Sequence, residues 1–216
     1  MPLLPLTIEG PSRTVVLTTA DFDPAGHAIL IKDADEGQLR TTGTECNVVY
    51  DLRVGARYQD HRDGAARELL DGGHIELLPG NSVIIETMEE VVFPGRLFGQ
   101  IMPKVTLLQK GIANTPTKID PGYSGPLLIT AFNHGKLPEQ IKRGERFCAM
   151  FIQTVAEGVR PYSKPGKRLR GAQQQRRWQR IRDLLEANIA AVTVALLLVT
   201  AVNTMVLLFS YFWALR

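Results

Sequence analysis

Residues 119–125 read Ile-Asp-Pro-Gly-Tyr-Ser-Gly, and residues 133–138 read Asn-His-Gly-Lys-Leu-Pro. A Pro-Gly pair favours a tight turn, because the proline ring fixes one backbone torsion angle and glycine tolerates a positive one. Between the two stretches lies a short apolar run, residues 127–132, of the length that is typical of a strand. The segment therefore predicts a strand between two tight turns.

The same pattern extends over the first 162 residues. Short apolar runs are separated by turn residues such as Pro79-Gly80-Asn81, Pro94-Gly95 and Arg143-Gly144. Runs at this spacing predict a mainly β domain, a sandwich or a barrel, over residues 1–162. Glycine-rich phosphate loops of the Walker or GxGxxG type are absent from the sequence. The expected strands are residues 14–17, 28–31, 48–54, 74–78, 82–87, 90–93, 97–102, 127–132 and 146–152.

The charge of the chain is nearly balanced but unevenly distributed. With 25 Lys and Arg against 22 Asp and Glu, the net charge of +3 does not suggest a nucleic-acid partner. From residue 160 to residue 182 every charged side chain is basic. Cys46 and Cys148 stand far apart and outside any Cys/His cluster, so the sequence predicts reduced thiols and no metal site.

The C-terminal part of the sequence predicts a membrane anchor. Residues 187–215 contain no charged side chain, and a bilayer is spanned by about 20 helical residues. Residues 163–186 form a basic linker and a partly amphipathic helix, whose arginines either contact anionic headgroups or only set the topology. Because the basic residues precede the span, the positive-inside rule places the N-terminal domain in the cytoplasm. We therefore expect a single-pass protein whose residues 187–215 lie in a lipid bilayer.

In their order and spacing, six pieces of the sequence resemble the dCTP deaminase branch of the dUTPase-like superfamily. The resemblance covers roughly residues 45–175. It implies a jelly-roll-like β fold and a homotrimer whose sites are shared between subunits; a bacterial inner membrane would fit the family. The six pieces are residues 49–55 (Val-Tyr-Asp-Leu-Arg-Val-Gly), 78–80 with 86–89, 119–125, 133–138, 143–144 and 159–162.

The resemblance also assigns site residues and a ligand. It implies a deoxynucleotide such as dCTP or dUTP, with Mg²⁺ accompanying the triphosphate. Asp120 would meet the 3′-hydroxyl of the deoxyribose, and in dUTPase relatives the matching carboxylate is the general base that activates water. Tyr123 would stack on the sugar, while Tyr162 and Gln173 match residues of the C-terminal lid. Without the other motifs, Asp120-Pro121-Gly122 would count as an ordinary turn.

Important parts of the family pattern are missing. Its phosphate segment, Arg-Ser-Ser-x-x-Arg, falls on residues 104–109, where Lys104 keeps a positive charge and Thr106 keeps a hydroxyl. Gln109 replaces the second arginine, so the bidentate phosphate clamp is lost. The catalytic glutamate of the deaminases falls on Thr130, whose hydroxyl does not relay protons at neutral pH. The lysine of the lid falls on Leu169.

These observations leave three functions open. The first is a membrane-anchored, deoxynucleotide-binding domain that lacks standard deaminase catalysis and acts as a nucleotide sensor or effector. The second is an active dCTP deaminase or dUTP pyrophosphatase that relies on the retained Asp120. The third is a purely structural trimer that clusters the membrane helices. We favour the first, because Thr130 and the broken phosphate clamp occur together with the anchor.

Overall fold

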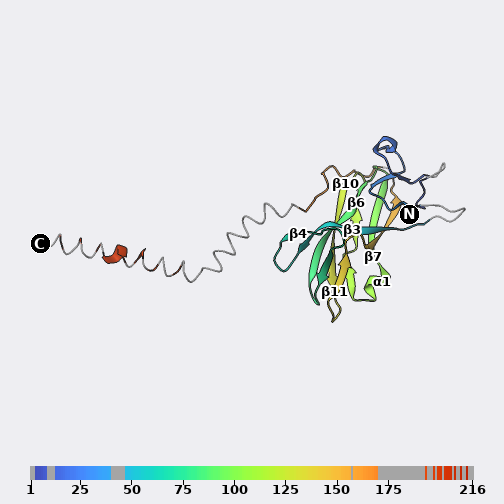
Figure 1. Cartoon of the computed structure of the whole chain (residues 1–216). Helices are drawn as coiled ribbons and strands as arrows, with labels where there is room; N and C mark the ends of the chain where they lie inside the picture. Colours follow the sequence, from blue (N-terminus) through green and yellow to red (C-terminus); the bar gives the residue numbers. More distant parts are fainter. Residues whose placement is uncertain are drawn as a thin grey trace. The chain divides into compact units, whose positions relative to one another are not determined.

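The structure is a computed structural model that describes residues 3–8, 13–39, 47–156 and 158–169, with scattered residues between 193 and 213 (Figure 1). The chain divides into two compact units, residues 1–172 and residues 173–216. The elements of the first unit are β1 (Val15–Val16), η1 (Thr19–Asp21), β2 (Ile29–Lys32), η2 (Glu36–Gln38), β3 (Tyr50–Asp60), β4 (Ala66–Glu68), β5 (His74–Leu77), β6 (Ser82–Val92), β7 (Leu97–Pro103), α1 (Val105–Leu108), β8 (Ile112–Asn114), β9 (Thr117–Ile119), β10 (Ser124–Asn133), β11 (Glu139–Lys142) and β12 (Arg146–Thr154).

Strand β3 joins the two halves of the main sheet. Its first residues pair with β12, which continues through β7 to β9, whereas its last residues pair with β4 and β6. Strand β6 in turn pairs with β2 and β10, and β10 with β8. A register shift between Val54 and Tyr58 marks the place where β3 changes partners. An irregularity of this kind bends a strand, so that its two ends can pair in different halves of the sheet.

The core lies between the two halves of the sheet. It is built from side chains that alternate between buried and more exposed positions along the strands. Inward-facing side chains include Leu52, Ile85, Ile101 and Ile129, all of which are buried. Gly55 sits at the register shift, and a Cβ there would lie 2.5 Å from the carbonyl oxygen of Glu86. Only glycine therefore allows β3 to approach β6 this closely.

The Asn-His-Gly-Lys-Leu-Pro stretch closes the far end of β10. The Nδ2 group of Asn133 donates hydrogen bonds to the carbonyl oxygens of Leu77 at 2.7 Å and Leu137 at 2.8 Å. Its Oδ1 accepts from the backbone N–H of Gly135 at 2.8 Å. Asn133 is buried, so these bonds satisfy its polar atoms away from water. The motif thus ties β10 to the small β5–β11 sheet.

The second unit is described only in part. All its described residues between 193 and 213 are helical, and Leu197, Met205 and Trp213 are among its exposed apolar side chains. In the part of the chain that the structure describes, no helix combines the length and the apolarity needed to cross a membrane. Residues 170–192 and many residues of the predicted span 187–215 lie outside the described residues.

The prediction of a mainly β domain is confirmed. Two of the expected strands, residues 82–87 and 90–93, are in fact the single strand β6. The sequence gives no sign of this continuity, because Glu86, Glu89 and Glu90 interrupt the apolar run. The helical turn α1 and the short strands β4, β8, β9 and β11 were not expected.

Candidate functional site

The turn between β9 and β10 brings three predicted site residues together. The backbone N–H of Tyr123 donates to the carbonyl oxygen of Asp120 at 3.1 Å, and the N–H of Tyr162 donates to that of Pro121 at 2.7 Å. The rings of Tyr123 and Tyr162 contact each other, with centroids 5.8 Å apart and an interplanar angle of 40°. The predicted sugar turn and the predicted lid tyrosine are therefore neighbours. The Asp120 carboxylate pairs with the Lys118 ammonium at 2.7 Å.

Gly122 allows the lid segment to lie against this turn. Its φ of +80° is in the left-handed region, and a Cβ there would lie 2.9 Å from Cβ of Pro161. We expect Gly122→Ala to lower the free energy of unfolding by about 1–3 kcal/mol, because it adds backbone strain and a clash. Urea unfolding of wild type and variant measures this. Gly72→Ala, at a similar positive φ of +75° but with open space around its Cβ, is the control for strain alone and should lose less stability.

The side chain of Tyr123 makes contacts within the protein that leave little room for a ligand. Its hydroxyl donates a hydrogen bond of 2.5 Å to the carbonyl oxygen of Pro126. Burial raises the pKa of the Tyr123 hydroxyl to about 12. A Cβ on Gly166 would lie 2.8 Å from the same hydroxyl oxygen, so the chain near Gly166 covers it. Stacking of a sugar on Tyr123 would therefore compete with the protein's own contacts.

Thr130 lies on the outer, half-buried face of β10. It pairs in register with Ile84 of β6, and Leu128, two residues earlier on the same face, pairs with Glu86. Side chains at such diagonal positions in a sheet lie about 7–8 Å apart. The structure thus places a carboxylate, Glu86, one diagonal step from the position where the resemblance puts a catalytic glutamate.

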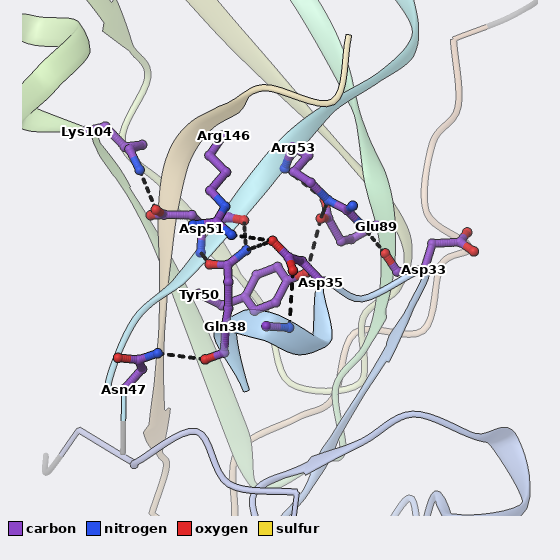
Figure 2. A network of polar contacts seen from close by, with 11 residues as sticks. Asp33, Asp35, Gln38, Asn47, Tyr50, Asp51, Arg53, Glu89, Lys104 and Arg146 are labelled. Atoms are coloured by element: carbon purple, nitrogen blue, oxygen red, sulfur yellow. Dashed lines mark hydrogen bonds and ion pairs between the residues drawn. The ribbon is translucent and has the colours of Figure 1, made fainter. Parts of the chain in front are cut away.

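The predicted phosphate segment forms α1 and its ends. Lys104 is the N-cap residue of α1, and its ammonium group forms an ion pair with the Asp51 carboxylate of β3 (Figure 2). Thr106 and Gln109 are exposed on the same short helical segment. The cation that the sequence keeps for phosphate is therefore neutralised by a partner within the chain.

A network of polar side chains extends from this ion pair to Glu89 (Figure 2). Glu89 is fully buried, and its carboxylate accepts from Nε of Arg53 at 2.7 Å, the N–H of Arg53 at 2.9 Å and the hydroxyl of Tyr50 at 3.1 Å. A buried carboxylate needs such partners, because an unpaired charge away from water is strongly unfavourable. The network therefore joins the Asp-Leu-Arg stretch of β3 to the Thr-Met-Glu stretch of β6.

The network continues to the surface through Asp35 and Gln38 (Figure 2). The hydroxyl of Tyr50 accepts from the N–H of Asp35 at 2.7 Å, and the Asp35 carboxylate pairs with Arg146 at 2.5 Å. Gln38 uses its side chain to bind both backbone groups of Asp51, at 2.8 Å and 3.0 Å. Residues far apart in the sequence thus fix the strand that carries Asp51.

The Asp35 carboxyl gives the domain a pH-dependent contact. The hydrogen bond from Arg146 holds the pKa of Asp35 below its ordinary value of 3.8. A lowered pKa in the folded state adds stability above the unfolded-state pKa, and this stability is lost as the pH falls toward the folded-state pKa. We expect Arg146→Gln to weaken the dependence of stability on pH between about pH 5 and pH 2. Urea midpoints at several pH values measure this; equal slopes in both proteins would contradict the assignment.

Residues 158–169, which include Tyr162, cross the outer face of the sheet and are called the strap. The N–H of Gly166 donates to the carbonyl oxygen of Ser124 at 2.9 Å. Near the end of the strap, the N–H of Leu169 donates to Oε2 of Glu86 at 2.8 Å, while Oε1 of Glu86 accepts from Arg57 at 2.6 Å. Leu169 itself is buried. The strap is thus held against β6 by a carboxylate that is itself held by an arginine of β3.

The predicted site residues therefore fall into separate groups. Asp120, Tyr123 and Tyr162 meet at one turn; Thr130 lies farther along β10; and Lys104, with Thr106 and Gln109, belongs to the α1 segment beside Asp51. Gln173 lies outside the described residues. Sequence reasoning assigned no role to Glu86, Glu89, Arg57 or Asp51. A signal was present, because charged residues within an otherwise apolar strand need partners.

Comparison with known proteins fits this arrangement of motifs. The dCTP deaminase-like family model matches residues 23–155. A dCTP deaminase from Thermococcus kodakarensis is 28% identical over 135 residues, which are 62% of this chain and 82% of that protein. A dCTP deaminase from Thermococcus gammatolerans is 30% identical over 135 residues, 62% of this chain and 81% of that protein.

Among solved structures, the 2′-deoxycytidine 5′-triphosphate deaminase from Agrobacterium tumefaciens is similar to this chain with a TM-score of 0.48 and 20% sequence identity, over 57% of this chain and 42% of that chain. The family model spans more than half of the sequence, and it includes both the polar network and the Asp120–Tyr123 turn. The chain therefore belongs to the dCTP deaminase-like family.

Proposed function

We propose that this protein is a membrane-anchored, deoxynucleotide-binding domain that lacks standard deaminase catalysis and acts as a nucleotide sensor or effector. The observation that carries the proposal is Thr130, which stands where the family resemblance calls for a proton-relaying glutamate. Deamination at C4 of cytosine requires a group that takes a proton from water and passes it to the leaving ammonia. A threonine hydroxyl does not do this at neutral pH.

The pairing of Lys104 supports the same proposal. In the family resemblance this residue begins the phosphate segment, yet its ammonium group is bound to Asp51. A triphosphate would have to displace a carboxylate to reach it, and Gln109 adds no charge. Among the described residues there is no cluster of three or more His, Cys, Asp or Glu suited to a metal ion, so Mg²⁺ would arrive with the triphosphate.

The ligand and the assembly are inferred from the family. The alignments with relatives named as dCTP deaminases cover most of the length of those relatives. This favours dCTP, or a product such as dUTP, as the ligand. A homotrimer would complete each site with residues of a neighbouring subunit. The uncharged residues 187–215 would anchor three helices in a bacterial inner membrane, with the β domain in the cytoplasm.

One observation favours a second candidate, an active enzyme. Glu86 lies one diagonal step from Thr130 on the same sheet face, where a carboxylate could take over proton relay if the strap moved away. Asp120, whose carboxylate pairs with Lys118 at 2.7 Å, would be the candidate carboxylate for dUTP hydrolysis. In an active enzyme, Asp120→Asn or Glu86→Gln should abolish product formation, according to which carboxylate acts.

A product assay on the purified full chain tests the proposal. We expect no dUTP, dUMP or ammonia after incubation with Mg²⁺ and dCTP or dUTP, and a rise in melting temperature with at least one of the two nucleotides. Product formation at an enzyme-like rate would reject the sensor and select the second candidate. No product together with no thermal shift, in a folded sample, would leave the purely structural trimer.

A further inference from the structure

We propose that Glu86 and Arg57, by binding the backbone of Leu169, hold the strap over Tyr123. We call these contacts the latch. A nucleotide can then reach Tyr123 only after Leu169 dissociates from Glu86. The proposal deepens the proposed function, since it names the contact that a bound nucleotide would break. It concerns residues 158–169, which hold both the Tyr162 ring and the last described residue before the second unit.

The latch is built from charge-assisted hydrogen bonds in a buried place. Glu86 is only 5% exposed, and it receives two bonds from Arg57, at 2.6 Å and 3.1 Å, besides the N–H of Leu169 at 2.8 Å. Arg57 also donates to the carbonyl oxygen of Leu169 at 3.5 Å. Both backbone groups of one residue are thus held by one ion pair. Bonds to ionised groups are roughly twice as strong as neutral ones.

The pattern of burial on β6 shows that the strap is seated here. Ile85, Glu86 and Thr87 are three consecutive buried residues, although neighbouring side chains of a strand face opposite sides. The core covers Ile85 and Thr87, so the outer side of Glu86 must be covered by something else. The 6% exposure of Leu169, together with its bond to Glu86, identifies the strap as that cover.

The same strap closes Tyr123. Its Tyr162 ring packs on the Tyr123 ring, and its Gly166 passes so near that a Cβ would lie 2.8 Å from the Tyr123 hydroxyl and 2.5 Å from the Ser124 carbonyl oxygen. A sugar that stacks on Tyr123 would need this space. Because the chain is continuous from Gly166 to Leu169, lifting the strap from Tyr123 pulls on the latch.

This arrangement gives a binding event a route to the second unit. While Leu169 is bound to Glu86, the chain that enters residues 170–216 starts from a fixed point. Release of Leu169 frees that point. A nucleotide sensor needs such a two-state element, and the differential contact is the Leu169–Glu86 bond.

Hydrogen exchange of the full chain, without and with dCTP and Mg²⁺, tests the latch directly. We expect the Leu169 amide to be protected in the wild type without nucleotide and to exchange about tenfold faster in Glu86→Gln, because a neutral amide binds it more weakly. Asp71→Asn is the control for the loss of a carboxylate charge, since Asp71 pairs with Arg143, which lies outside the strap, and it should leave the Leu169 amide unchanged. Gly166→Ala should also speed exchange of the Leu169 amide, because the added Cβ displaces the strap while the Glu86 side chain is unchanged.

Nucleotide affinity then tests the blocking role. We expect Glu86→Gln and Gly166→Ala each to bind dCTP about fivefold more tightly than the wild type, because the strap no longer competes. Weaker binding in both variants would overturn the proposal, since the strap would then act as a stabilising cover for the nucleotide. An unprotected Leu169 amide in the wild type would also overturn it. If neither the wild type nor the variants bind dCTP, and the Leu169 amide is protected in the wild type but not in Glu86→Gln, the latch is confirmed and the proposed nucleotide function is rejected.

Discussion

Replacing Glu89 by glutamine is expected to lower the free energy of unfolding by about 3 kcal/mol, because it leaves buried partners of a carboxylate without their charge. Glu89 is fully buried and accepts three hydrogen bonds, two of them from Arg53. The substitution keeps the shape of the side chain but removes the negative charge and turns one acceptor into a donor. A donor now faces the donors of Arg53 or Tyr50, which is the costly arrangement. Urea unfolding of the full chain measures the loss, with pulse proteolysis of the β unit as the readout of the unfolded fraction.

The neighbouring residue provides the control for this prediction. Glu90 lies on the same strand but faces outward, where it pairs with Lys32 at 3.7 Å and with Arg168. Exposed pairs of this kind contribute little, so Glu90→Gln should change stability by less than about 1 kcal/mol. Equal losses in the two variants would show that the network in Figure 2 does not hold β3 to β6.

The strands were the most predictable part of this fold. Alternating and apolar runs such as those of β7, β10 and β12 are local signals, and the sequence placed them within a few residues of their observed bounds. The Pro-Gly turn before Tyr123 was equally readable, because its backbone demands are met by those two residues. The resemblance then put Asp120, Tyr123 and Tyr162 in one site, and the structure brings these three together.

The partners of the charged residues could not be predicted from the sequence. Glu89 pairs with Arg53 across 36 positions, and Leu169 pairs with Glu86 across 83. Such contacts depend on which strands become neighbours and on their register, and neither is encoded in a local pattern. For the same reason the sequence places the charge of Lys104 in the predicted phosphate segment but does not reveal its ion pair with Asp51.

The pairing of Lys104 with Asp51 leads to a prediction about affinity. We expect Asp51→Asn to raise the affinity for dCTP about tenfold, because it frees a cation that lies in the predicted phosphate segment, and bonds between ionised groups are worth about 1.5–3 kcal/mol. The backbone bonds of Asp51 to Gln38, at 2.8 Å and 3.0 Å, do not involve the carboxylate and should survive. Isothermal titration calorimetry of the full chain with dCTP and Mg²⁺ measures the change.

Two further variants show whether the gain comes through Lys104. In the wild-type background Lys104→Gln should change the affinity less than twofold, since the ammonium group is already paired. In the Asp51→Asn background the same substitution should remove the whole gain, and such a difference between backgrounds measures coupling. Asp63→Asn, which removes a negative charge paired with Arg67 elsewhere on the surface, is the control for net charge. A gain that persists in the double variant, or that appears in Asp63→Asn, would mean that dCTP responds to overall charge and not to Lys104. A gain confined to Asp51→Asn would mean that this chain carries a phosphate cation held in reserve by its own carboxylate.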